Sequence, residues 1–220
     1  MNQTALKFSI MTATVALAAM LAGVFLAEIY REQDSRAMLL PNQVMKLLPH
    51  PQPLTAFALT DHKGRVFDLA SLKGKWSFVV FGFTHCPDVC PTTLVTLARA
   101  RDKIVKNTAG PDDVQFVFVS VDPGRDTPDK LAHYVEYFDR SFLGVTGDNA
   151  QIGNLAGQLR APYEVGSAPG VENYPVFHTA AIFLLDPRAR YHAVFTPPHD
   201  ADALSKRLTV VRELEGADSP

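Results

Sequence analysis

The chain has 220 residues, of which 47% are hydrophobic and 20% charged, so its composition is that of a folded protein with one main core. Its formal net charge of −2, without any cluster of lysines and arginines, excludes an electrostatic case for nucleic-acid binding. Two cysteines are too few for a disulfide-stapled small domain or a four-sulfur zinc site.

Residues 8–27 form an uncharged apolar segment that begins directly after Lys7. At a rise of about 1.5 Å per residue, such a segment matches the thickness of a bilayer core, so we predict one transmembrane helix within residues 1–30. A cleaved signal peptide is the alternative, but the small residues Ala16 and Ala18 come too early in the apolar run to mark its cleavage site. The count of basic residues on either side leans toward a cytoplasmic domain, but it does not decide the orientation.

Residues 31–53 are rich in proline, which disfavours helix and predicts an extended tether. The folded domain is therefore expected to cover residues 54–215. It should open with a hairpin, because residues 54–60 and 65–69 flank the turn-forming sequence Asp-His-Lys-Gly at 61–64.

Short apolar runs predict strands, and runs with one apolar stripe predict helices. The expected strands are residues 77–83, 114–121, 179–185 and 191–195; the expected helices begin at Pro91, Pro128, Asn149 and Ala201. Thr127 is a plausible N-cap for the second helix, with proline at the first helical position. Alternating strands and helices of this order predict an α/β domain of three layers with a mixed central sheet. The leading candidate is a thioredoxin-like fold, because a cysteine pair follows the first long strand.

Cys86 and Cys90 lie in the sequence FGFTHCPDVCPTTL at 81–94, between a predicted strand and a predicted helix. On a helix, residues four positions apart share a face, with Cβ atoms about 5–6 Å apart. The helix N-terminus, and His85 if protonated, would lower the pKa of the thiols. We therefore expect a thiolate pair that either exchanges disulfides or binds a soft metal ion. A buried inert disulfide, or two thiols packed in the core, is the alternative.

Two sulfurs do not fill a metal site, so a third ligand has to come from another segment. The five methionines lie in the predicted span or tether. Four histidines outside the cysteine turn are expected to be exposed or solvated: His50, His62, His133 and His199. His192 is expected to lie in a strand with edge character. His178 differs, because it opens the apolar run that ends at Leu185. In a thioredoxin-like sheet the start of that strand lies near the cysteine turn, so we expect His178 to reach both sulfurs.

These motifs resemble the SCO/SenC family of membrane-tethered copper-binding proteins. The resemblance rests on the run at 81–94, the loop Asp-Pro-Gly-Arg-Asp-Thr-Pro at 122–128, and His178-Thr179 before a strand that ends in Asp186-Pro187. It covers about residues 54–214. One departure is Phe177, which stands where the family often has an acidic residue.

The resemblance implies that Cys86, Cys90 and His178 bind copper, as Cu(I) and also as Cu(II), and that the cysteines are redox-active. It implies a copper chaperone that delivers copper to, or reduces the thiols of, the binuclear copper centre of cytochrome c oxidase. The expected partners are the copper-bearing oxidase subunit, other copper chaperones or thiol reductants, and the membrane through the N-terminal helix. The implied location is the bacterial periplasm or the mitochondrial intermembrane space.

Two thiolates and a neutral imidazole form a soft site that suits Cu(I), whereas Cu(II) would take a fourth ligand. Alternatives remain open. The main one is a membrane-tethered thiol–disulfide oxidoreductase that keeps partner cysteines reduced, and zinc could use the same three ligands. The sequence does not assign roles to Arg125 and Asp126, which capping of the helix start or partner docking would both explain.

Overall fold

The computed structural model describes residues 20, 22–23, 45–107, 113–166 and 174–217. The chain divides into two units, residues 1–41 and 42–220, and the account below concerns the second. Most of the predicted transmembrane segment lies outside the described residues. Within the described ranges, no helix combines the length and apolar character needed to cross a bilayer. The N-terminal anchor therefore stays a prediction.

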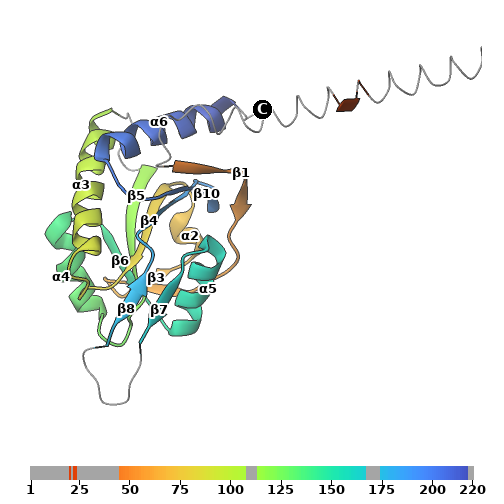
Figure 1. Cartoon of the computed structure of the whole chain (residues 1–220). Helices are drawn as coiled ribbons and strands as arrows, with labels where there is room; N and C mark the ends of the chain where they lie inside the picture. Colours follow the sequence, from red (N-terminus) through yellow and green to blue (C-terminus); the bar gives the residue numbers. More distant parts are fainter. Residues whose placement is uncertain (1–19, 21, 24–44, 108–112, 167–173, 218–220) are drawn as a thin grey trace, which may run out of the picture. The chain divides into compact units, whose positions relative to one another are not determined.

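An eight-stranded mixed sheet forms the centre of this unit, in the order β1-β10-β9-β4-β5-β6-β2-β3 (Figure 1). Its central strands β4, β5 and β6 are parallel, and the remaining pairs are antiparallel. The strands are β1 Met45–Pro53, β2 Leu59–Asp61, β3 Val66–Phe67, β4 Trp76–Gly82, β5 Val114–Ser120, β6 Leu143–Thr146, β9 Ile182–Leu185 and β10 Arg190–Phe195. A separate two-stranded ribbon consists of β7 Tyr163–Val165 and β8 Val176–His178.

Helices cover both faces of the sheet, so the predicted layered α/β arrangement is observed. They are α2 Leu69–Leu72, α3 Val89–Asn107, α4 Pro128–Phe138, α5 Asn149–Leu159 and α6 Ala201–Ala217. On one face, α2 and α5 pack into a core that includes Val79 and Phe81 of β4. On the other face Phe78 stacks on Phe116, and α3 contacts both α4 and α6. Successive β4 side chains thus alternate between the two cores, which explains why this strand is buried along its whole length.

The local signals in the sequence predict most of these elements correctly. The hairpin turn at 61–64 joins β2 to β3, and β9 pairs with β10 as expected. The side chain of Thr127 accepts a hydrogen bond from the Lys130 amide and caps α4, and Pro128 is the first residue of that helix. The predicted helix at 149–159 is confirmed with the same bounds.

The structure differs from the prediction at the start of the domain, where part of the expected tether forms strand β1. This strand pairs with β10 at the edge of the sheet, and its register shifts between Leu47 and Gln52. Prolines are tolerated there because an edge strand leaves half of its N–H groups without a ladder partner. The sheet therefore begins before Leu54. The expectation of edge character for His192 is wrong, since β10 lies between β1 and β9 and His192 is buried.

A second difference concerns the strand that was expected to start at His178. Residues 179–181 do not belong to a strand, and β9 begins only at Ile182. His178 instead ends β8, where it pairs with Tyr163 of β7. The candidate ligand therefore lies on a ribbon outside the main sheet.

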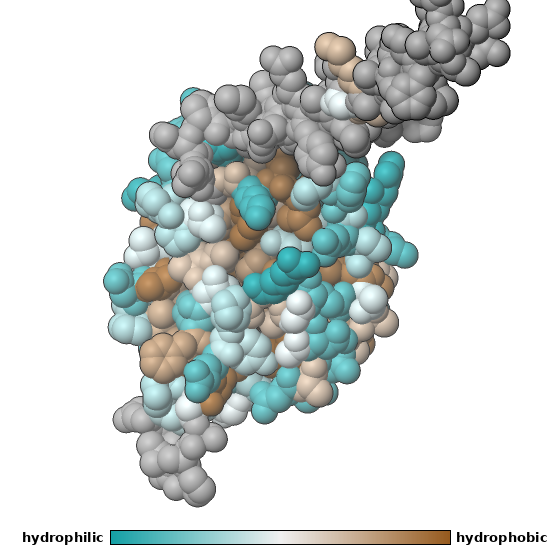
Figure 2. All heavy atoms as spheres, turned by 45° about the vertical axis from the view of Figure 1, so that its right-hand side comes forward, coloured by the Kyte–Doolittle hydropathy of each residue, from teal (hydrophilic) through white to brown (hydrophobic). Residues whose placement is uncertain are grey.

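On the face drawn in Figure 2, hydrophobic side chains reach the surface in small patches between hydrophilic ones.

Candidate metal or redox site

The two cysteines lie where the chain passes from β4 into α3. Cys86 belongs to the turn, with its amide donating to the Phe83 carbonyl at 3.1 Å, and Cys90 is the second residue of α3. Both are buried free thiols. Gly82 makes room for them, because a Cβ at this position would lie 2.5 Å from Cys90 Sγ. The end of β4 thus holds the second sulfur against the sheet.

A buried carboxylate fixes the turn that carries Cys86. Asp126 is fully buried and accepts hydrogen bonds from the Thr84 amide at 2.9 Å and the Thr84 hydroxyl at 2.6 Å. Its Oδ2 also accepts from the Ser120 hydroxyl at 2.6 Å, which ties the turn to the end of β5. Asp126 therefore holds the cysteine turn in place, a role that its position in the sequence did not reveal.

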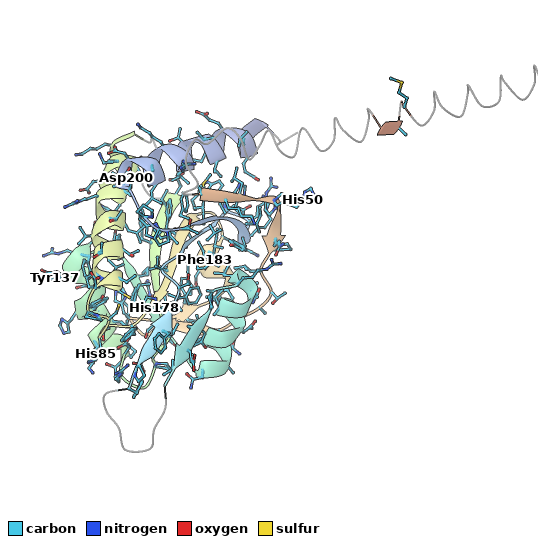
Figure 3. All side chains as sticks on the ribbon, viewed as in Figure 1. His50, His85, Tyr137, His178, Phe183 and Asp200 are labelled. Atoms are coloured by element: carbon cyan, nitrogen blue, oxygen red, sulfur yellow. The ribbon has the colours of Figure 1, made fainter. Side chains whose placement is uncertain are left out.

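His178 reaches the cysteine pair from the β7–β8 ribbon. Its Nε2 lies 3.3 Å from Cys90 Sγ, and the two sulfurs and a ring nitrogen of His178 all lie within 4.8 Å of one another. Its Nδ1 lies 2.9 Å from the Thr179 carbonyl, a group that can only accept, so Nδ1 carries the proton of the neutral ring. The lone pair on Nε2 then faces the sulfurs, which is the tautomer a metal ligand needs. Figure 3 shows His178 and His85 at the same end of the molecule.

The ribbon that carries His178 is docked on the loop before α4. Tyr174 donates a hydrogen bond to Asp122, and its ring lies under the guanidinium of Arg125 at 3.8 Å from the centroid. The same guanidinium lies 5.6 Å from the centroid of Phe83, whose ring meets the His178 ring edge-on at 5.8 Å. The role of Tyr174 was not predicted from the sequence, because no local signal indicates its contact with Asp122, 52 positions away.

The electrostatics of the pair differ from the expectation. Burial raises the pKa of the Cys90 thiol strongly, and the nearby Cys86 and Asp126 raise it further. An interaction with the Phe83 backbone favours the thiolate but does not offset these effects. The expected lowering of the thiol pKa is therefore wrong for Cys90, where burial is the largest effect and raises the pKa. A bound cation would reverse this balance, since a coordinating thiol is deprotonated.

A small pocket gives access to this end of the molecule. It is lined by Cys90, His178 and the segment Thr179–Ala181, among others. Val89 and Phe177 near it are 41% and 66% exposed. An apolar surface thus lies beside the partly buried ligand atoms.

The remaining histidines do not join the cysteines. His50 and His133 are exposed, as predicted. The expected exposure of His62 is wrong: it is buried because β2 pairs with β6, and its Nδ1 accepts from the Gly144 amide at 3.0 Å. His199 is half-buried rather than solvated, and its Nε2 donates to the Ala180 carbonyl at 2.6 Å, which steadies the segment after His178.

His192 belongs to a second cluster with Asp186 and Glu215. Arg190 contacts both carboxylates and so occupies this place with its own positive charge. The cluster is an ion-pair network at the end of β9, the end away from the cysteines.

A mixed sheet with helices on both faces defines a thioredoxin-like domain. The two thiols at its strand-to-helix turn face an imidazole and form a candidate soft-metal or redox site. The chain belongs to the SCO1/SenC family, whose model matches residues 48–212. The resemblance seen in the sequence is thereby confirmed.

Known relatives cover the same region. The mitochondrial SCO2 homologue of Bos taurus is 36% identical over 149 residues, which are 68% of this chain and 56% of that protein. The chain spans about half the length of the mitochondrial relatives it matches. A relative from Stutzerimonas stutzeri is 32% identical over 180 residues, 82% of this chain and 87% of that protein. The crystal structure of Arabidopsis thaliana ScoI with copper bound has 36% identity and a TM-score of 0.65, covering 74% of this chain and 98% of that one.

Proposed function

We propose that this protein is a copper chaperone that binds one copper ion through Cys86, Cys90 and His178. The observation that carries the proposal is the convergence of two thiol sulfurs and one imidazole nitrogen within 4.8 Å, from segments 88 positions apart. Copper bound to the related Arabidopsis thaliana ScoI supports the choice of metal. Soft sulfur ligands also select Cu(I) over hard cations.

The geometry suggests how the ion would be held. The Nδ1–H of His178 is bound to the Thr179 carbonyl, so the ring offers Nε2 as a neutral ligand without losing a proton. The two thiols must release their protons when copper binds, which couples loading to pH. Asp126 and Gly82 hold the sulfurs without contributing ligand atoms, so the metal meets groups already close to their bound positions. The same three ligands suit Cu(I), and Cu(II) would add a fourth ligand from solvent.

We propose further that the copper is passed to the binuclear copper centre of cytochrome c oxidase, with the copper-bearing oxidase subunit as acceptor and another copper chaperone as donor. Membership of the SCO1/SenC family supports this role. The predicted N-terminal helix would anchor the domain in the membrane, facing the bacterial periplasm or the mitochondrial intermembrane space. A periplasm-active reporter fused after Pro220 should then be active, and activity of a cytoplasm-active reporter alone would contradict the orientation.

A Cu(I) titration of the reduced, purified protein against a chromophoric competitor tests the ligand set. The wild type should bind one Cu(I), and Cys86→Ser, Cys90→Ser and His178→Ala should each weaken binding. His133→Ala is the control, because this histidine is exposed on α4 and outside the ligand set. Zn(II) in the same assay shows whether the site prefers copper. If His178→Ala loads copper like the wild type, the three-ligand site is refuted.

The second candidate function is thiol–disulfide exchange with a partner protein. The observation in its favour is that both cysteines are free thiols, four residues apart at a helix start, with their sulfurs within 4.8 Å. In this reaction Cys86 and Cys90 would form a disulfide, and their two electrons and two protons would convert a partner disulfide to two thiols. Strong insulin reduction together with normal copper loading by His178→Ala would favour this function over the first.

A further inference from the structure

Two neighbouring residues of the loop before α4 contact opposite halves of the site. Asp126 holds the cysteine turn through Thr84, as described above. Arg125 turns the other way and contacts Phe83 and Tyr174, which lie next to the cysteine turn and on the chain leading into β8. The loop therefore bridges two segments that have no sequence proximity.

We infer that Arg125 is a positioning residue that holds the imidazole of His178 against the two sulfurs through Tyr174 and Phe83. This inference rests on the proposed function, since it concerns the third ligand of the proposed copper site. It assigns a role to a residue whose function the sequence left open.

Arg125 makes one hydrogen bond and two ring contacts beside the site. Asp122 is buried, with 1% exposure, and accepts from both the guanidinium Nε of Arg125 and the Tyr174 hydroxyl. The guanidinium lies 3.8 Å from the Tyr174 ring centroid on one side and 5.6 Å from the Phe83 ring on another. Such an arrangement combines a charge-assisted hydrogen bond with cation–π attraction, so it fixes orientation as well as distance.

The ribbon that carries His178 needs this support. A two-stranded ribbon is at best marginally stable by itself. Among the described strands β7 and β8 pair only with each other, and Tyr163 and Val176 pack against the main core. The pairing joins Tyr163 to His178 at one end and Val165 to Val176 at the other. Tyr174 lies two residues beyond that second end, so the contact with Arg125 anchors the ribbon at the end opposite His178.

Loss of the anchor should affect the two oxidation states of copper differently. When the imidazole is misplaced, the two thiolates still hold Cu(I), though less tightly, because it is a soft ion that accepts few ligands; Cu(II) depends more strongly on the imidazole nitrogen. Groups that orient a ligand without touching the metal typically account for about 10–100-fold in affinity. We therefore expect Arg125→Ala to speed Cu(II) loss to a chelator about 10–100-fold, and to change Cu(I) loss much less.

The variants separate the parts of the contact. Arg125→Lys keeps the charge but loses the planar group that stacks on Tyr174, so it should fall between Arg125→Ala and the wild type. Tyr174→Phe keeps the ring and removes only the hydrogen bond to Asp122. The control is Arg190→Ala, which removes an equivalent arginine from buried Asp186 at the far end of β9. It should lower stability without changing copper loss.

Two measurements on the purified full chain test whether Arg125 positions His178. In the metal-free protein, amide hydrogen exchange at residues 176–178 should be faster in Arg125→Ala but not in Arg190→Ala. In the Cu(II)-loaded protein, electron paramagnetic resonance should show imidazole nitrogen coupling in the wild type and a weakened signal in Arg125→Ala. A folded Arg125→Ala variant with wild-type exchange, nitrogen coupling and copper loss would overturn the inference. If the wild type binds no copper, the proposed function fails, and the exchange measurement still shows whether Arg125 holds the ribbon.

Discussion

The close contact between Gly82 and Cys90 makes Gly82→Ala a quantitative test of the site. A methyl group at this position would lie 2.5 Å from Cys90 Sγ and 2.8 Å from the Phe118 ring. Unstrained contacts between such atoms lie at roughly 3.5–4.0 Å, so one partner has to move by about 1 Å. The backbone of Gly82 is paired with Ser120 in the sheet, so the displacement falls on the sulfur and the ring.

We expect this overpacking to destabilise the protein by about 1–3 kcal/mol. For a domain of this size each 1 kcal/mol lowers Tm by about 2–4 °C. A shift of about 1 Å also exceeds the roughly 0.5 Å within which a binding constellation has to be held. Gly82→Ala should therefore weaken Cu(I) binding as well as stability, which thermal unfolding and competitor titration measure separately.

Two other glycines supply the controls. Gly147→Ala would place its methyl 2.6 Å from Leu59 Cδ2, in the region of β2, and should cost stability while leaving Cu(I) affinity unchanged. Gly157 lies in α5 with nothing within 4 Å of the added methyl, so Gly157→Ala should stabilise the protein by about 0.5–1 kcal/mol. The reasoning is refuted if Gly82→Ala matches the wild type in both stability and Cu(I) affinity.

Three further predictions follow from buried polar groups. Asp126→Asn leaves one acceptor oxygen for three donors, so it should lower stability by about 1.5–3 kcal/mol and speed alkylation of Cys86, measured by urea unfolding and mass spectrometry. Burial opposes ionisation of Asp186, but its interactions with His192 and then Arg190 outweigh burial and hold its pKa below 3.8. The ionised Asp186 carboxylate stabilises the fold fully above pH 3.8, and this stabilisation is lost as the pH falls through the lower pKa of the folded state. The urea midpoint of Asp186→Asn should therefore fall less steeply with acid than that of the wild type. The buried hydroxyl of Tyr134 has no hydrogen-bond partner among the described residues. Tyr134→Phe should therefore keep the stability of the wild type or raise it by up to about 1 kcal/mol. A lower urea midpoint would contradict this prediction.

The parts of the site that lie close together in sequence could be predicted from it. The apolar run of β4, the cysteine turn and the start of α3 are adjacent in the chain, and each has a local signal that tertiary packing does not override. The N-cap of α4 could likewise be predicted, because Thr127 precedes a proline at the first helical position. The convergence of His178 on the cysteines was expected, although its strand was not.

Long-range contacts account for what the sequence did not reveal. The β7–β8 ribbon is too short to give a periodic signal, and its contact with Asp122 joins positions 52 residues apart. The pairing of β1 with β10 turned a proline-rich segment into a strand and buried His192. The prediction for the thiol of Cys90 failed for a related reason, because a rule for helix ends takes no account of desolvation by distant segments.

The same contacts explain why the ligand atoms stay available. Asp126 binds the backbone and hydroxyl of Thr84 rather than a sulfur, and Arg125 contacts rings beside His178 rather than its Nε2. His178 uses Nδ1 for its hydrogen bond to the chain. Each ligand is therefore oriented by a neighbour or by the atom that faces away from the site. The protein bears the ordering cost of the site when it folds, so an ion arriving at the proposed site would meet two sulfurs and a nitrogen that are already close together.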